Sequence, residues 1–214
     1  MLNIGDSPQH ILSIPLASLE DLIPNHRPSY SLYNVRESYG DPTLVEIATI
    51  AKITAALEPK IIFEFGTFEG GTTSHLAINS SDKSKIITLD LGSDDTKKIW
   101  DTTLDVYPSE VGFRFKNAPF EKKITQLLGD SQIFDFSIYH KKVDLVFVDA
   151  CHHYEHVKKD SENAFKMLRR GGIILWHDYA SYASGVKKAL HEIAKERHLQ
   201  QIMGTSLVIY KDNS

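Results

Sequence analysis

Short apolar runs alternate with helical patterns along most of this 214-residue chain, and this alternation constrains the fold more than any other feature. Apolar runs at 61–65, 86–89, 143–148 and 173–176 are separated by stretches with apolar residues at helical spacing. A strand–helix–strand succession implies a parallel sheet with helices packed on its faces. Apolar runs of this kind suit strands that are buried on both faces.

The last part of the chain departs from this alternation. Residues 200–210 read as two short strands around the glycine turn at Gly204. We therefore predict an α/β fold: a Rossmann-like, doubly wound, mostly parallel seven-stranded sheet with an antiparallel C-terminal hairpin. Helices are expected at 44–58, 71–79, 154–168 and 186–197, with the basic and glycine residues 169–172 as the stop signal of the third.

Two segments lack a clear pattern. Residues 1–43 hold five of the eight prolines and show no sustained periodicity, apart from a short helix expected near Leu16 to Leu22. We interpret 1–43 as an N-terminal arm or cap and 44–214 as the main domain. Residues 91–122 are mixed in character, and both segments are expected to supply the walls of a binding pocket.

Composition excludes several classes of protein. The 24 basic and 28 acidic residues give a net charge of −4, and no basic run resembles a nucleic-acid-binding track. No apolar run approaches the ~18 residues of a membrane helix, and the first residues lack a leader pattern, so we expect a cytoplasmic protein without membrane contact. The single cysteine, Cys151, excludes an internal disulfide and any multi-cysteine metal site.

A glycine-rich turn follows the first buried strand, in the sequence Glu64-Phe65-Gly66-Thr67-Phe68-Glu69-Gly70-Gly71. Such a turn lets backbone N–H groups approach a ligand closely, and Asp90, at the end of the next strand, is placed to accept hydrogen bonds from ribose hydroxyls. The spacing E-x-G-x-x-x-G differs from the G-x-G-x-x-G of dinucleotide sites, and it puts a carboxylate before the first glycine. A carboxylate there suits a cationic ligand.

In these features, over residues 44–210, the chain resembles class I S-adenosylmethionine-dependent methyltransferases. The resemblance implies that Glu64, Gly66 and Thr72 surround the methionine part of the cofactor and that Asp90 binds its ribose. It places Asp130 and Ser131 near the adenine. The implied cofactor-binding set is Glu64, Gly66, Thr67, Phe68, Gly70, Thr72, Asp90, Asp130, Ser131 and Asp149.

Two further strands end in acidic and histidine residues: Asp149 and His152 after one, His177 and Asp178 after the other. Two facing carboxylates suit Mg²⁺, which can lower the pKa of an acceptor hydroxyl. Here the sequence is similar to the metal-dependent catechol-type and macrocin-type O-methyltransferases. That similarity implies Asp149 and Asp178 as metal ligands, with His152 as general base and Asp149 also in the catalytic set. We expect His177 as a further metal ligand in place of the one that these families carry at the position of Tyr179. Tyr179 departs from these families, which usually carry Asp or Asn there.

The predicted function is therefore methyl transfer from S-adenosylmethionine to a hydroxyl of a small-molecule acceptor, with Mg²⁺ assistance, in a homo-oligomer. A sugar, a phenol or a polyketide-like hydroxyl fits equally, and N-methylation stays open. One alternative is an NAD(P)-linked oxidoreductase; another is a non-catalytic cofactor-binding module, which Tyr179 favours. We do not expect zinc at Cys151-His152-His153, because adjacent side chains diverge and there is one thiol.

Overall fold

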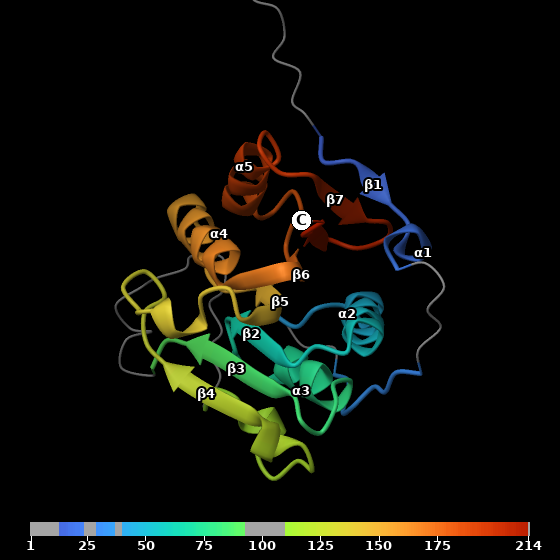
Figure 1. Ribbon diagram of the computed structural model, residues 1–214, viewed down its shortest axis with the longest axis vertical. Coiled ribbons are helices and arrows are strands. Elements are labelled where there is room, and N and C mark those ends of the chain that lie inside the picture. Colours follow the sequence, from blue (N-terminus) through green and yellow to red (C-terminus); the bar gives the residue numbers. More distant parts are fainter. Residues whose placement is uncertain (1–12, 24–28, 37–39, 93–109, 214) are drawn as a thin grey trace, which may run out of the picture.

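The computed structural model describes residues 13–23, 29–36, 40–92 and 110–213 (Figure 1). Within these residues the centre of the molecule is an eight-stranded sheet in the order β1-β7-β8-β6-β5-β2-β3-β4. Along the chain the strands are β1 (Leu16–Ala17), β2 (Ile61–Phe65), β3 (Lys85–Asp90), β4 (Ile124–Leu128), β5 (Val143–Val148), β6 (Leu168–Trp176), β7 (Leu199–Ile202) and β8 (Val208–Lys211).

The strand directions confirm the predicted fold class. Neighbouring strands are parallel except at β8, which runs antiparallel to both β6 and β7. The sheet is thus mostly parallel with an antiparallel C-terminal hairpin. It has one strand more than the predicted seven, because β1 pairs with β7, with Leu16 opposite Gln201 and Ala17 opposite Ile202.

The extra strand also corrects the short helix expected from Leu16 to Leu22. Only its second half is helical, as α1 (Leu19–Leu22), which begins where the Ser18 hydroxyl accepts a hydrogen bond from the Asp21 N–H. The first half is extended because the Gln201 N–H donates to the Pro15 carbonyl at 2.8 Å. A strand of two residues has no alternating pattern by which the sequence could predict it.

Helices cover both faces of the sheet, as Figure 1 shows. One face carries α4 (Tyr154–Met167) and α5 (Ser184–Ile193), and the other carries α2 (Leu44–Leu57) and α3 (Gly71–Ile78). Alternate residues of one strand point to opposite faces. In β5, Val146 packs in the core cluster under α4 and α5, whereas Phe147 packs in the cluster under α2 and α3. The described residues also form 3-10 turns at Phe113–Phe115, Glu121–Lys123 and Ser137–Tyr139.

The expected helix stop at residues 169–172 is wrong. Helix α4 already ends at Met167, and residues 168–176 form β6. The strand pairs with β5 at Leu168 opposite Val143, shifts register, and continues with Ile173 opposite Leu145. The basic and glycine residues thus form an irregular start to a strand rather than the end of a helix.

A buried carboxylate explains the basic residue in this stretch. Asp144, inside the apolar run of β5, accepts hydrogen bonds from the N–H groups of Lys60 and Ile61 at 2.9 and 2.7 Å. The Arg169 guanidinium pairs with its other oxygen. The buried Asp144 carboxylate therefore has hydrogen-bond partners at the edge of the sheet where β5 begins, opposite the edge where the parallel strands end.

In the described ranges, no helix combines the length and the apolar character needed to cross a membrane.

Candidate active site

The candidate site lies where the parallel strands β2, β3, β5 and β6 end. The glycine-rich turn follows β2, Asp90 ends β3, Asp149 follows β5, and residues 177–178 follow β6. Strand β2 pairs with β3 on one side and with β5 on the other, so the strand order reverses there. In open α/β sheets this reversal opens the crevice in which ligands bind.

Glu64 is the most deeply buried acid of this edge, with 1% of its surface exposed. One carboxylate oxygen, Oε2, accepts hydrogen bonds from the hydroxyls of Thr73 and Thr88 at 2.5 and 2.6 Å. The other, Oε1, has no hydrogen-bond partner among the described residues. Burial, with a smaller contribution from the negative charges of Asp149 and Asp90, raises the pKa of Glu64 to about 8. A buried carboxylate oxygen without a donor is costly, and a cationic ligand would satisfy it.

The glycine turn approaches the β5 loop so closely that only glycine fits at its start. A Cβ atom at Gly66, whose φ is +88°, would lie 2.0 Å from the carbonyl oxygen of Asp149. The turn is fixed from β3, because Oδ2 of Asp90 accepts hydrogen bonds from the N–H groups of Thr67 and Phe68 at 2.8 and 2.7 Å. These bonds hold Phe68 in the left-handed region at φ +49°. Asp90 therefore shapes the glycine turn, a role that the sequence did not indicate.

Asp90 can still bind a ribose. Its second oxygen accepts from the Leu91 N–H at 2.7 Å, so three hydrogen bonds occupy a carboxylate that offers about four lone-pair sites. Burial raises the pKa of Asp90, against the hydrogen bonds from Phe68, Thr67 and Leu91. Of the remaining residues expected around the methionine part, Thr72 is buried in the first turn of α3, and Gly70 precedes that helix.

The expected adenine residues lie in the loop after β4. Asp130 closes a turn by accepting a hydrogen bond from the Gln132 N–H at 2.8 Å, and Ser131 accepts one from the Gln132 side chain at 3.2 Å. Behind them the sequence analysis missed Asp160, a buried carboxyl of α4 that hydrogen-bonds with Ser131. Burial raises the pKa of Asp160 to about 7, and the nearby charge of Asp130 adds to the effect.

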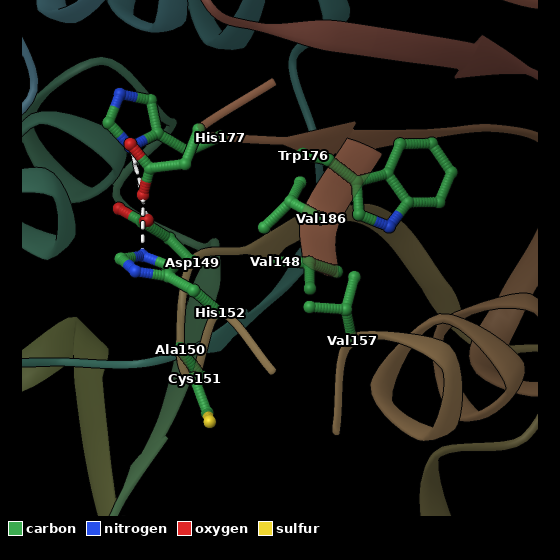
Figure 2. Close-up of a pocket in the computed structure, with 10 residues that line it drawn as sticks. Val148, Asp149, Ala150, Cys151, His152, Val157, Trp176, His177 and Val186 are labelled. Atoms are coloured by element: carbon green, nitrogen blue, oxygen red, sulfur yellow. Dashed lines mark hydrogen bonds and ion pairs between the residues drawn. The ribbon is translucent and has the colours of Figure 1, made fainter. Parts of the chain in front are cut away.

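The second set of expected residues converges in a pocket between the β5 and β6 loops (Figure 2). The His152 Nε2 lies 2.7 Å from Oδ2 of Asp178, and the His177 Nδ1 lies 3.1 Å from Oδ1 of Asp149 and 3.2 Å from Oδ2 of Asp178. One ligand atom each from Asp149, His152 and Asp178 meet within 4.8 Å of one another. The structure thus brings together all four residues expected to carry the chemistry.

Sequence reasoning missed two members of this cluster. Glu46, buried on α2, lies 3.3 Å from the His177 Nε2 through Oε2, and its Oε1 accepts from the N–H and hydroxyl of Ser206 at 2.8 and 2.7 Å. The hydroxyl group of Tyr182 donates a hydrogen bond to Asp178. The pattern Thr43-x-x-Glu46 marks a capping box, and both of its reciprocal hydrogen bonds form, so α2 could have been given a precise start. Nothing in the sequence shows that the same carboxylate reaches His177.

The charges of this cluster compensate one another. Burial alone would lower the pKa of His177, but Asp149, Asp178 and Glu46 outweigh it and raise that pKa well above its usual value. Burial would likewise raise the pKa values of the acids, yet contacts with His177 and Ser206 hold the pKa of Glu46 low, and the two histidines hold the pKa of Asp178 low. Asp178 also adopts a left-handed φ of +59°, a strained conformation typical of functional positions.

The aromatic residues near these loops serve the core. Trp176 is fully buried and donates its indole N–H to the Ser161 hydroxyl at 2.9 Å, although it also borders the pocket. Tyr179, the departure from the metal-dependent families, pairs its hydroxyl with the His191 Nε2 at 2.7 Å. Residues 1–12, 24–28, 37–39 and 93–109, which belong to the two segments expected to supply pocket walls, lie outside the described residues.

A family model described as a methyltransferase domain matches residues 63–179. An uncharacterized protein of Acanthamoeba polyphaga mimivirus is 27% identical over 123 residues, 56% of this chain and 51% of that protein, so the chain matches about half the length of this relative.

Solved structures share the architecture at low identity. An O-methyltransferase from Bacillus cereus in complex with S-adenosylhomocysteine has a TM-score of 0.62 and 16% identity, covering 82% of this chain and 84% of that chain. The O-methyltransferase TomG from Streptomyces achromogenes, involved in tomaymycin synthesis and solved with S-adenosylmethionine, has a TM-score of 0.58 and 13% identity, covering 81% and 82%. These likenesses establish the fold.

Proposed function

The chain belongs to the methyltransferase-domain family, and from this premise we propose that it transfers the methyl group of S-adenosylmethionine to a hydroxyl oxygen of a small-molecule acceptor. The observation that carries the choice of a hydroxyl acceptor is the His152–Asp178 pair, with 2.7 Å between Nε2 and Oδ2, next to the Asp149 carboxylate. A neighbouring base is what a hydroxyl needs in order to become a nucleophile.

Glu64 and Asp90 are proposed to hold the cofactor. The unpartnered Oε1 of Glu64 is the acceptor for the cofactor's ammonium group, and the remaining capacity of Asp90 takes the ribose hydroxyls. Both O-methyltransferase structures described above contain an adenosyl cofactor, in support of this assignment. An NAD(P)-linked enzyme is disfavoured, since the turn lacks the dinucleotide glycine spacing and the family model is that of a methyltransferase.

His152 is proposed as the general base, with Asp178 orienting its ring. A carboxylate can only accept a hydrogen bond, so the His152 Nε2–H donates to Asp178, and Nδ1 becomes the basic nitrogen of the neutral ring. The proton of the acceptor hydroxyl passes to Nδ1 as the oxygen attacks the methyl carbon, and the sulfonium leaves as a neutral thioether. Alignment of oxygen, methyl and sulfur supplies much of the rate.

The donor set also fits a divalent cation. The carboxylates of Asp149 and Asp178 and the imidazole of His152 offer ligand atoms within 4.8 Å of one another, largely shielded from solvent. We propose Asp149 and Asp178 as ligands of Mg²⁺. His177 is the nitrogen ligand expected from the sequence, and its Nδ1 lies 3.1 Å from Asp149 and 3.2 Å from Asp178. When bound, the cation would supply a positive charge that lowers the pKa of the acceptor hydroxyl.

The test is methyl transfer from labelled S-adenosylmethionine to a panel of sugars, phenols and polyketide-like alcohols, with Mg²⁺ or with a chelator. The variant His152→Gln should lose about 10²–10⁴-fold in rate. The variant His198→Gln, at an exposed histidine, is the matched control and should keep full activity. Unchanged transfer in His152→Gln would refute the assigned base. Cofactor binding without transfer to any acceptor would favour the non-catalytic module instead.

A further inference from the structure

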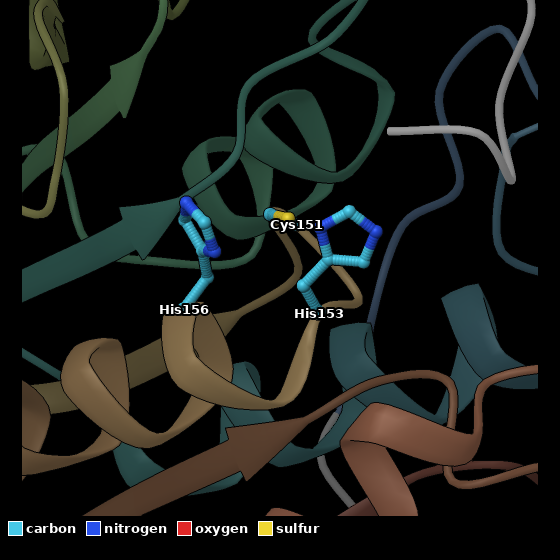
Figure 3. Close-up of side chains that lie close together, drawn as sticks. All are labelled: Cys151, His153 and His156. Carbon is cyan, nitrogen blue, oxygen red and sulfur yellow. The ribbon is translucent and has the colours of Figure 1, made fainter. Parts of the chain in front are cut away.

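A second cluster of metal-ligating side chains lies beside the first and takes no part in the proposed methyl transfer. Cys151, His153 and His156 offer one thiol and two imidazole nitrogens that all lie within 4.8 Å of one another. Figure 3 shows the three side chains converging from the loop after β5 and the first turn of α4. His152, which belongs to the tripeptide Cys151-His152-His153 where zinc was not expected, turns toward Asp178 instead, and His156 takes its place in the cluster.

The side chains of this loop divide between two clusters. Asp149 and His152 point into the carboxylate cluster, whereas Cys151 and His153 point into the second one. His156 joins Cys151 and His153 because residues three apart at the start of a helix lie on the same face. The resulting spacing, Cys-x-His-x-x-His, is compact enough for one ion to bind all three residues.

Two observations indicate that the histidines serve something other than local structure. His153 occupies the position before α4, where Ser, Thr, Asp or Asn usually caps the helix, yet its side chain makes no capping hydrogen bond. The Nδ1 atom of His156 is buried and has no hydrogen-bond partner among the described residues. A buried nitrogen without a partner is costly, and a bound metal would satisfy it.

We propose that Cys151, His153 and His156 bind a Zn²⁺ ion. Thiolate and imidazole donors suit zinc, whereas Mg²⁺ prefers the oxygen-rich cluster next to it. Three protein ligands leave the fourth tetrahedral position to a water molecule. Zinc binding fixes the backbone on both sides of His152, so the ion holds the loop that presents the catalytic histidine.

The experiment is a titration of the reduced, metal-free full-length protein with Co²⁺, used as a spectroscopic probe for Zn²⁺. The unmodified protein should develop a thiolate-to-cobalt charge-transfer band that saturates at one equivalent and disappears when Zn²⁺ is added. Cys151→Ser should lack the band. His153→Gln and His156→Gln should bind at least ~100-fold more weakly, since even the loss of a residue that only orients a ligand costs ~10–100-fold.

Two controls separate this site from its surroundings. His198→Gln alters an exposed histidine and should keep the band, and so should Asp178→Asn, which removes a donor of the carboxylate cluster. Circular dichroism of each variant checks that it is folded. Absence of the band in the unmodified protein would overturn the proposal, and so would unchanged cobalt affinity in both histidine variants. The readout is independent of methyl transfer, so failure of the proposed function leaves this result intact.

Discussion

The substitution Glu64→Gln should change how the stability of the unliganded protein depends on pH. The buried carboxyl has its pKa raised from 4.5 to about 8, so it is protonated in the folded protein at neutral pH while the unfolded chain is ionised. Below pH 4.5 the carboxyl group is protonated in both the folded and the unfolded state, and its contribution to the stability of the folded protein is fully present. Stability is then lost as the pH rises toward 8. A pKa difference of about 3.5 corresponds to about 5 kcal/mol.

Glutamine mimics the protonated acid and cannot ionise. Urea denaturation of both proteins at several pH values between 4.5 and 8 measures the effect. The free energy of unfolding of Glu64→Gln, minus that of the unmodified protein, should rise by about 4 kcal/mol across this range, because each end of the range equals one of the two pKa values and leaves that titration half complete. Other groups with raised pKa values, such as Asp90 and Asp160, cancel in this difference. A difference that stays constant with pH would refute the reasoning.

The same carboxyl predicts the proton balance of cofactor binding. An ammonium group placed at Oε1 favours the ionised form, so S-adenosylmethionine should displace close to ~1 proton at pH 7, where an acid of pKa about 8 is mostly protonated. Isothermal titration calorimetry in buffers of different ionisation enthalpy measures the released proton. Glu64→Gln should bind more weakly and release none from this position.

Other predictions concern the supports of the site. Gly66→Ala places a methyl group 2.0 Å from the Asp149 carbonyl oxygen at a φ of +88°. The left-handed backbone of an alanine costs ~1–2 kcal/mol before this clash is counted. The variant should therefore have a lower melting temperature and show no cofactor binding by calorimetry. Arg114 donates hydrogen bonds to both carboxylate oxygens of Asp41 at 2.8 Å, and Arg114→Ala removes them. The free energy of unfolding in urea should fall by ~3–5 kcal/mol. A fall of less than ~1 kcal/mol would show that the pair contributes little. Asp178→Asn should remove any Mg²⁺ stimulation of transfer, measured against a chelator, and retained stimulation would assign the metal elsewhere.

Much of the fold could be predicted because buried parallel strands have a strong signature. The runs at Ile61–Phe65 and Val143–Val148 become strands with the expected bounds. The errors fall where tertiary pairing overrides a local signal. Residues 169–172 carry a helix-stop pattern but pair with β5, and residues 16–17 are extended only because β7 lies beside them.

The candidate site was predictable as far as strand ends are predictable. Asp149, His152, His177 and Asp178 follow two adjacent parallel strands, so the topology alone brings them to one edge. Glu46 could not be foreseen, since it reaches His177 from a helix more than a hundred residues away in the chain. The split of the loop into two clusters was equally hidden, because it depends on how each side chain leaves a non-repetitive backbone.

The central claim is that an adenosyl cofactor binds over Glu64 and Asp90, and thermal unfolding with added ligands tests it most directly. S-adenosylmethionine and S-adenosylhomocysteine, each at 100 times its dissociation constant, should stabilise the protein by ~2.7 kcal/mol, whereas NAD⁺ and NADP⁺ should leave it unchanged. Stabilisation by NAD⁺ or NADP⁺ in place of the adenosyl compounds, or by none of the four, would contradict the account.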